Sequence, residues 1–319
     1  MKGVFLDTDS IAPADLNTLA LQSSLDSWTF YPSTLAGQQL ERIKDADVVI
    51  TNKIQINAEL MQAATKLKLI LVAATGANNI DLTAAKKYGI AVANVRGYGP
   101  ATVAQHTFAL ILALSTNLIN YAENVRQGLW SKNHFFCLLH HPITELADKN
   151  LLIVGYGEIG KAVAQAAKGF GMQVMIARSL RESAPIDQTR KPLAELLPLA
   201  DVVTLHCPLT PETNNLIDAE AIASMKPSAF LVNVSRGGLV NETALVTALK
   251  SNQIAGAGVD VLTVEPPVNG NPLIDEPLPN LIVTPHCAWG SREARQRLVD
   301  EMVLNLQAFL NDQPRNRLV

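Results

Sequence analysis

The sequence predicts an α/β protein built from two doubly wound parallel sheets, which are Rossmann-like units. Two series of short apolar runs, separated by helical patterns, indicate buried parallel strands. The second series begins with a glycine fingerprint that is typical of nucleotide-binding sheets. With 319 residues, of which 48% are hydrophobic and 17% charged, the chain is long and apolar enough for two domains.

The first series has four predicted strands, at 3–7, 47–51, 69–73 and 90–94, with a helix expected over 57–68. The stretch 94–100 is rich in glycine and ends in proline, which indicates a connection. A long helix is expected over 102–126. Its many apolar positions predict burial on more than one side. Weak periodicity over 128–149 predicts an ordered loop.

The second series starts with the segment NLLIVGYGEIG and is the more regular of the two. One amphipathic helix closes the chain, and such a lone helix can pack on either domain. The strands of this series are expected at the start of 150–160 and at 172–177, 201–206, 229–234, 254–260 and 281–286, with the closing helix at 290–312.

Composition and charge exclude several functional classes. The net charge of −3 attracts no polyanion, so neither nucleic acid nor a membrane is an expected partner. The N-terminus carries acids where a signal peptide needs an apolar run, and the apolar stretch 108–114 is too short to span a bilayer. Cys137, Cys207 and Cys287 lack metal-ligand spacing, so we expect free thiols, buried or incidental, and no metal. The composition favours a soluble cytoplasmic protein.

Gly155, Gly157 and Gly160 form a G-x-G-x-x-G fingerprint directly after the strand LLIV and before a helical pattern. The first glycine permits a tight turn, the second lets a pyrophosphate approach the backbone, and the third lets the helix pack on the strand. A glycine turn without a ligand is the alternative. The surrounding strands and helix favour a dinucleotide site.

The residue that follows the next strand decides which dinucleotide is expected. An acid at this place binds the ribose hydroxyls of NAD, but here the residue is Arg178. A guanidinium pairs with a 2′-phosphate, and Ser179 and Arg181 add a donor and a charge. The alternative is an arginine that stacks on adenine or points to water. We expect NADP or NAD, with NADP favoured.

Polar residues also follow the later strands of the second series. Arg236 follows 229–234, Asp260 ends 254–260 with Glu265 five residues later, and His286 ends 281–286. Because ligands sit beyond the carboxyl ends of parallel strands, these side chains are expected to converge.

Together they have a natural chemistry with a nicotinamide. His286 protonates a ketone oxygen, Glu265 orients the imidazole, and Arg236 clamps a substrate carboxylate. Taken singly, each has a structural explanation: a capped core histidine, a solvated loop acid, a surface ion pair.

These segments resemble the D-isomer-specific 2-hydroxyacid dehydrogenases over essentially the whole chain. The matching motifs are LLIVGYGEIGKAVAQAAKGFGMQV, AFLVNVSRGGLVNETALVTAL, AGAGVDVLTVEPP and VTPHCAWGS. The resemblance implies Arg236, Glu265 and His286 as catalytic residues. It also implies a substrate-binding domain of 1–97 and 287–319, into which a dinucleotide-binding domain of 98–286 is inserted. The long segment 102–126 is a candidate dimer element, with an ordinary interdomain helix as the alternative, and the family implies a homodimer formed largely through the cofactor domain.

The resemblance adds further binding residues. The glycine turn AATGANNID supplies backbone amides for the substrate carboxylate, and Trp289 walls a small pocket. The expected substrate site comprises Thr75, Gly76, Ala77, Arg236, His286 and Trp289. The expected cofactor site comprises Val103, Gly155, Gly157, Glu158, Ile159, Gly160, Arg178, Ser179, Cys207, Pro208, Thr213, Val234, Ser235, Arg236, Asp260 and His286.

Within the family, the segments ATGANNID, GYGPATVAQHTFAL and HCAWGSREARQRL look most like the glycerate dehydrogenase, or hydroxypyruvate reductase, branch. That branch implies reduction of hydroxypyruvate or glyoxylate to D-glycerate or glycolate. Reduction of another 2-oxo acid is one alternative, and two further alternatives lie outside that chemistry. One is formate oxidation, which Glu265 disfavours because that family usually has glutamine there. The other is a dinucleotide-sensing protein resembling the corepressors of this fold, although the chain has no extension beyond the catalytic fold.

Overall fold

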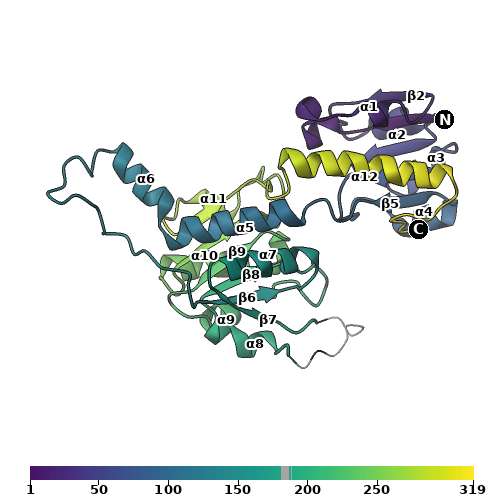
Figure 1. Cartoon of the computed structure of the whole chain (residues 1–319). Helices are drawn as coiled ribbons and strands as arrows, with labels where there is room; N and C mark the ends of the chain where they lie inside the picture. The colour runs from purple at the N-terminus through teal and green to yellow at the C-terminus, as the bar shows by residue number, and fades with distance from the viewer. Residues whose placement is uncertain (181–186, 188) are drawn as a thin grey trace. The chain divides into compact units, whose positions relative to one another are not determined.

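The computed structural model describes residues 1–180, 187 and 189–319 and divides into two compact units. The first unit joins Met1–Gly99 to Trp289–Val319, and the second is Pro100–Ala288 (Figure 1). The second unit is therefore inserted into the first along the chain. Both are parallel-sheet α/β units, so the predicted fold class is confirmed.

The first unit has a five-stranded parallel sheet in the order β2-β1-β3-β4-β5. Its strands are β1 Lys2–Phe5, β2 Ser27–Phe30, β3 Val48–Thr51, β4 Leu69–Val72 and β5 Ala91–Asn94. The strands β3, β4 and β5 are buried throughout, which explains why they appear as continuous apolar runs. The edge strand β2 was not predicted, because its mostly exposed residues have no such run.

Helices cover both faces of this sheet. They are α1 Leu19–Gln22, α2 Gln39–Ile43, α3 Ala58–Ala63, α4 Leu82–Tyr88 and α12 Arg292–Leu310, with 3₁₀ turns η1 Thr8–Ile11 and η2 Pro13–Asp15. The side chain of Ser291 accepts a hydrogen bond from the amide of Ala294 and so caps the start of α12. Leu298, Met302 and Leu306 recur at helical spacing and are buried in one core of the first unit. The closing helix thus packs on the sheet that begins the chain.

The second unit has a six-stranded parallel sheet in the order β11-β10-β9-β8-β6-β7. Its strands are β6 Asn150–Val154, β7 Gln173–Ile176, β8 Val202–Leu205, β9 Phe230–Asn233, β10 Gly256–Val259 and β11 Leu281–Val283. Its helices are α5 Pro100–Ser115, α6 Leu118–Arg126, α7 Glu158–Gly169, α8 Leu193–Leu196, α9 Ala219–Ala223, α10 Glu242–Lys250 and α11 Pro272–Asp275, with 3₁₀ turns η3 Leu197–Leu199 and η4 Gly237–Leu239. The strand order reverses between β6 and β8, and ligands of such sheets bind beyond this switch point.

Two glycines of β10 let α5 lie close to the sheet. A Cβ atom on Gly258 would stand 3.0 Å from the Cβ of Leu110, and one on Gly256 would stand 3.1 Å from a methyl of Leu114. This close packing brings the first turns of α5 to the carboxyl end of β10 and β11.

The long helix predicted over 102–126 is wrong as a single element. Asn117 has a left-handed backbone with a φ of 53°, and it separates α5 from α6. No single helix in the described residues is long and apolar enough to span a membrane; α5 and α6 together reach the length but are bent by 61°. The segment 128–149 has no helix or strand before β6 and fits the predicted ordered loop.

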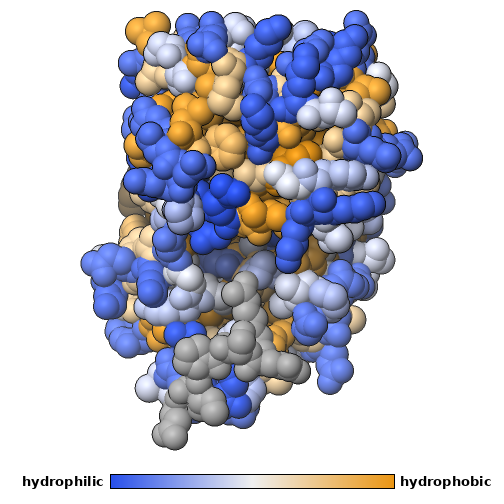
Figure 2. Space-filling view, turned by 90° about the vertical axis from the view of Figure 1, so that its right-hand side faces the viewer, coloured by the Kyte–Doolittle hydropathy of each residue, from blue (hydrophilic) through white to orange (hydrophobic). Residues whose placement is uncertain are grey.

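Hydrophilic residues predominate on the face shown in Figure 2, with hydrophobic areas between them. Cys137, Cys207 and Cys287 form no disulfide among the described residues, as expected. Cys137 and Cys207 are half-buried, whereas Cys287 is exposed.

Candidate active site

The glycine loop connects β6 to α7 at the switch point of the second unit. Gly155 has a φ of +98°, and a Cβ atom there would stand 2.5 Å from the amide nitrogen of Cys207. A Cβ atom on Gly160 would stand 2.2 Å from the carbonyl oxygen of Gly155, so a side chain would force α7 away from the loop. Both positions therefore require glycine for packing.

Gly157 has a different environment from the other two glycines. It is the N-cap residue of α7, and within the described part of the chain no side chain caps the helix and a Cβ atom there would meet nothing within 4 Å. The first turn, which holds Glu158 and Ile159, therefore offers backbone N–H groups and the positive end of the helix dipole toward open space. This opening fits the pyrophosphate of a dinucleotide.

The turns after β8 and β9 are joined beside this loop. The hydroxyl of Ser235 donates to the carbonyl oxygen of Cys207 over 2.7 Å, and Val234 is buried just before it. Thr213 is buried, and its hydroxyl donates to the carbonyl oxygen of Pro208 over 2.8 Å and accepts from the amide of Thr210 over 2.7 Å. The structure therefore uses the hydroxyl of Thr213 inside its own turn.

Arg178 and Ser179 follow β7, as the sequence predicts, and both are exposed. The amide of Arg178 donates to the carbonyl oxygen of Lys191 over 2.8 Å, which fixes the backbone at this point. No ion pair of the Arg178 side chain occurs among the described residues. Arg181 lies outside the described residues.

The matching switch point of the first unit is filled by a carboxylate of the chain itself. Asp7 follows β1 and is buried, and it accepts hydrogen bonds from the amides of Asn52 over 2.9 Å and Lys53 over 2.8 Å. These amides are therefore occupied by the chain itself, whereas the glycine loop of the second unit leaves its amides as the candidate nucleotide site.

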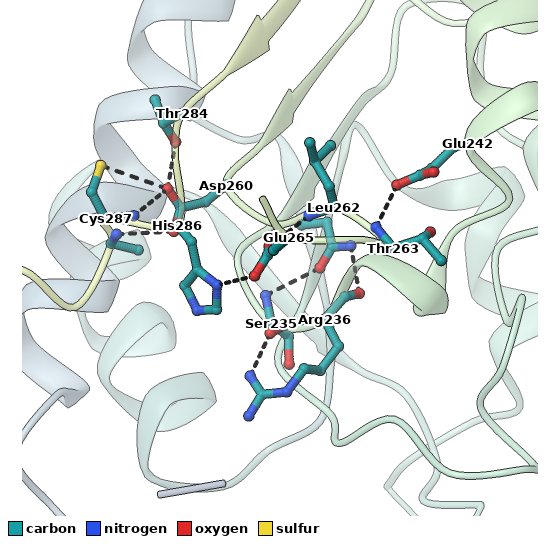
Figure 3. Close-up of polar contacts among 12 residues, drawn as sticks. Ser235, Arg236, Glu242, Asp260, Leu262, Thr263, Glu265, Thr284, His286 and Cys287 are labelled. Atoms are coloured by element: carbon teal, nitrogen blue, oxygen red, sulfur yellow. Dashed lines mark hydrogen bonds and ion pairs between the residues drawn. The ribbon is translucent and has the colours of Figure 1, made fainter. Parts of the chain in front are cut away.

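His286 and Glu265 form the central pair of the candidate site. His286 Nδ1 lies 2.6 Å from Oε2 of Glu265, while Oε1 of the same carboxylate accepts the amide of Leu262 over 2.8 Å (Figure 3). A carboxylate only accepts, so Nδ1 carries the proton and Nε2 is left as the other reactive atom of the ring. Both side chains are partly exposed, at 30% and 34%.

The backbone of His286 is held in an uncommon conformation. Its φ is 51°, in the left-handed region, and its amide donates to the carbonyl oxygen of Asp260 over 2.7 Å. Residues that are held in this region cost free energy and gather at functional sites. The turn after β11 therefore directs the ring of His286 toward Glu265.

Asp260 is the buried centre of a hydrogen-bond network behind this pair. Its Oδ1 accepts the hydroxyl of Thr284 over 2.5 Å and the amide of Cys287 over 3.0 Å, and its Oδ2 accepts the amide of Ala288 over 2.9 Å. Only one lone pair, on Oδ2, is then not engaged by these donors. Burial, followed by the charge of Asp260, raises the pKa of the nearby Cys287 thiol.

His106 joins this network from α5 and was not identified from the sequence. Its Nε2 lies 3.0 Å from the hydroxyl of Thr284 and 3.5 Å from Oδ1 of Asp260. No sequence signal marked this histidine, because it lies within an apolar helical pattern. The approach of α5 to β10 brings it to the site.

Arg236 lies at the end of β9 on a turn that packs tightly on the Glu265 loop. A Cβ atom on the next residue, Gly237, would stand 2.0 Å from the carbonyl carbon of Leu262. Arg236 is exposed and its guanidinium donates to the carbonyl oxygen of Ser235 over 2.7 Å (Figure 3). One of its five N–H donors is thereby used, which leaves donors for a bidentate bond to an anion.

The remaining predicted residues divide between the units. Val103 lies buried in α5 of the second unit. The first unit holds the exposed Thr75, whose hydroxyl donates to the carbonyl oxygen of Val95 over 2.9 Å, and Gly76 and Ala77 follow in the same turn. It also holds Trp289, whose ring meets that of Tyr98 edge to face at 6.3 Å.

Comparison with known proteins agrees with this geometry. The family model described as D-isomer specific 2-hydroxyacid dehydrogenase, NAD binding domain, matches residues 108–288, which is more than half of the chain. The chain belongs to this family. It is an oxidoreductase of the D-2-hydroxyacid dehydrogenase type, and its cofactor is a nicotinamide dinucleotide.

Two curated relatives and one solved structure show how far the similarity of this dehydrogenase extends. The glycerate dehydrogenase of Methylorubrum extorquens is 43% identical over 99% of this chain and 98% of its own. The hydroxypyruvate reductase of Blautia hydrogenotrophica is 38% identical over 99% of both chains. The acyclic imino acid reductase Bsp5, in complex with NADPH and D-Arg, is 28% identical, with a TM-score of 0.85 over 100% of both chains.

Proposed function

We propose that this dehydrogenase reduces hydroxypyruvate or glyoxylate, to D-glycerate or glycolate, and prefers NADPH. The observation that carries the proposal is the pair of His286 and Glu265, at 2.6 Å, beside the turn of Arg236. Glycerate dehydrogenase, hydroxypyruvate reductase and glyoxylate reductase are the names of several relatives, which supports a short 2-oxo acid as substrate.

The proposed proton transfer runs through His286. A reduced nicotinamide dinucleotide supplies the hydride when it is bound. Nε2 of His286 donates the proton that the ketone oxygen needs, and Glu265 on Nδ1 stabilises the imidazolium before the transfer. In the oxidation direction the same Nε2 accepts the proton from the alcohol. The histidine therefore acts as acid and base at one atom.

The proposed substrate-binding residue of the second unit is Arg236. Arg236 binds the carboxylate of the oxo acid in bidentate fashion and polarises the neighbouring carbonyl. Within the first unit, the turn of Thr75, Gly76 and Ala77 is proposed to offer backbone amides to a carboxylate, and Trp289 to suit a short substrate. In this proposal 1–97 with 287–319 binds substrate, and 98–286 binds the dinucleotide.

The proposed cofactor site begins at the glycine loop. Gly155, Gly157 and Gly160 with the first turn of α7 bind the pyrophosphate, and Asp260 binds the nicotinamide amide with the lone pair that its network leaves. Arg178 and Ser179 bind the 2′-phosphate of NADPH, since a guanidinium pairs with phosphate. Bsp5, a neighbour in fold, was solved with NADPH. The proposed edge of the loop is lined by the turns after β8 and β9, with Cys207, Pro208, Val234 and Ser235. Thr213 supports the turn of Pro208 through its hydroxyl.

We also propose a homodimer formed through α6 and the segment that follows it. Figure 1 shows both standing out from the sheet of the second unit. Their large apolar side chains are exposed to an extent that is unusual for a surface. These are Leu118, Ile119, Val125, Leu129, Trp130, Phe135, Phe136, Leu139 and Ile143. A second copy that covers this segment removes it from water.

The test is a hydride-transfer assay with a small panel of 2-oxo acids, each measured with NADPH and with NADH. We expect the highest kcat/KM for hydroxypyruvate or glyoxylate with NADPH. A higher kcat/KM for a larger 2-oxo acid would contradict the proposed substrate. A higher value with NADH would contradict the cofactor preference alone.

A further inference from the structure

A second arginine lies against the glycine loop of the second unit. The guanidinium carbon of Arg190 stands 5.5 Å from the ring centroid of Tyr156, the residue between Gly155 and Gly157. A cation over an aromatic face is attracted by the ring and is held in place by it. The side chain of Arg190 therefore lies at the rim of the loop where α7 begins.

The backbone ties Arg190 to the end of β7 as well. Ala177 and Lys191 form an isolated parallel bridge, and the amide of Arg178 donates to the carbonyl oxygen of Lys191 over 2.8 Å. Arg190 therefore directly precedes the residue whose carbonyl oxygen accepts the Arg178 amide. Two arginines, which are twelve residues apart in the sequence, therefore lie on neighbouring backbone segments at the end of β7.

Asp187 holds the guanidinium of Arg190 by one edge. Arg190 Nε lies 2.9 Å from Oδ2 of Asp187, and the hydroxyl and amide of Thr189 donate to Oδ1 of the same carboxylate. The bonds from Thr189 and then Arg190 lower the pKa of Asp187. The carboxylate is therefore charged at neutral pH. Because its bond uses Nε, the donors on both Nη atoms have no partner among the described residues and can bind a second anion.

We infer that Arg190 is a second specificity residue, which binds the 2′-phosphate of the cofactor together with Arg178. The inference rests on the proposed preference for NADPH and extends it to a residue outside the strand-end position. The phosphate carries close to two negative charges and accepts several hydrogen bonds, so two guanidinium groups match it better than one. Tyr156 and Asp187 hold Arg190 in place before the phosphate arrives, which lowers the entropy cost of binding.

The experiment measures binding of two fragments to the whole chain by isothermal titration calorimetry. Adenosine 2′,5′-bisphosphate carries the 2′-phosphate, and adenosine 5′-monophosphate lacks it. We expect Arg190→Ala to raise the Kd of the bisphosphate by about tenfold or more, because a charged hydrogen bond is lost. The Kd of the monophosphate is expected to change by no more than about twofold. Arg190→Gln, which keeps a long polar side chain over Tyr156, is expected to give the same result.

Lys250→Ala is the matched control. Lys250 is an exposed cation of the same unit, paired with Glu276, and it is the last residue of α10, which connects β9 to β10. We expect its removal to leave the affinities for both fragments unchanged. If Lys250→Ala weakened binding of the bisphosphate as much as Arg190→Ala does, the effect would come from net charge alone.

The outcomes separate the two proposals. If the unmodified protein favours the bisphosphate and Arg190→Ala does not change that preference, the assignment of Arg190 is wrong and the proposed function stands. If Arg190→Ala weakens both fragments equally, Arg190 supports the loop and is no specificity residue. If the unmodified protein does not favour the bisphosphate, the preference for NADPH itself fails.

Discussion

Nδ1 of His286 lies 2.6 Å from Oε2 of Glu265, and the carboxylate of Glu265 is anchored by the amide of Leu262 on its own loop. This hydrogen bond fixes the position of the carboxylate independently of the histidine. The positive φ of His286 directs the ring toward that carboxylate. The pair is therefore preorganised from both sides, by a loop on one and by a strained turn on the other.

Glu265→Gln is expected to lower the kcat of reduction by about tenfold or more, because a charged hydrogen bond to the ring of His286 is replaced by a neutral one. The KM of the oxo acid is expected to change little, because Glu265 contacts the histidine and its own loop. Steady-state kinetics at saturating cofactor measure both constants for the two proteins. An unchanged kcat would show that Glu265 does not act on the histidine.

His286→Ala is expected to lower kcat by about 10²–10⁴-fold, the usual contribution of a general acid or base. Binding of the dinucleotide, measured by quenching of tryptophan fluorescence, is expected to stay within a few-fold. Loss of both activity and binding would indicate a folding role. Cys287→Ala, one residue further along the chain, is the neighbouring control and is expected to retain most of the activity.

Arg236→Ala is expected to raise the KM of the oxo acid by about tenfold or more, since a charged bidentate bond is lost. Arg236→Lys keeps the charge but not the fork, so it is expected to recover only part of the effect. Steady-state kinetics at saturating cofactor measure both. An unchanged KM in the alanine variant would show that Arg236 does not bind the substrate carboxylate.

Arg178→Asp is expected to move the preference toward NADH. The aspartate repels a 2′-phosphate and accepts hydrogen bonds from the ribose hydroxyls. We expect the ratio of kcat/KM for NADPH to that for NADH to fall by about tenfold or more. Lys250→Asp, which changes an exposed cation at the end of α10, is the matched control. An unchanged ratio in Arg178→Asp would mean that this position does not select the cofactor.

His206 is expected to destabilise the folded protein in acid. Burial lowers the pKa of His206 to about 3, and its Nδ1 is buried without a hydrogen-bond partner in the described structure. In the unfolded chain a histidine titrates near about 6.5, so between these values the unfolded state binds a proton that the folded state does not. Stability therefore falls as the pH drops through this window, by up to about 1.4 kcal/mol per pH unit.

His206→Gln removes this titration and keeps an amide for the bond to Thr204. Urea unfolding at pH 7, 6 and 5 is expected to show a smaller loss of stability in the variant than in the unmodified protein. His134→Gln, at an exposed histidine, is expected to leave the loss unchanged. Equal losses in all three proteins would exclude His206 as the source.

Much of the fold could be predicted because buried parallel strands leave an unbroken apolar run. The runs at 47–51, 69–73 and 201–206 became β3, β4 and β8 for this reason. β2 carries no such run, because it is an exposed edge strand. The break at Asn117 was missed because asparagine adopts a left-handed backbone only in certain contexts, which the local pattern does not record.

The sequence by itself determined the α/β class, the glycine loop and the residues at the strand ends. Each of these depends on short-range patterns that the neighbouring residues record. Only the tertiary structure decided which groups meet across long separations in the chain. The bond of His286 to Glu265, the position of His106 beside Asp260 and that of Arg190 over Tyr156 are of this kind. Such contacts depend on which strands neighbour one another and how closely a helix approaches the sheet, and no local spacing encodes that.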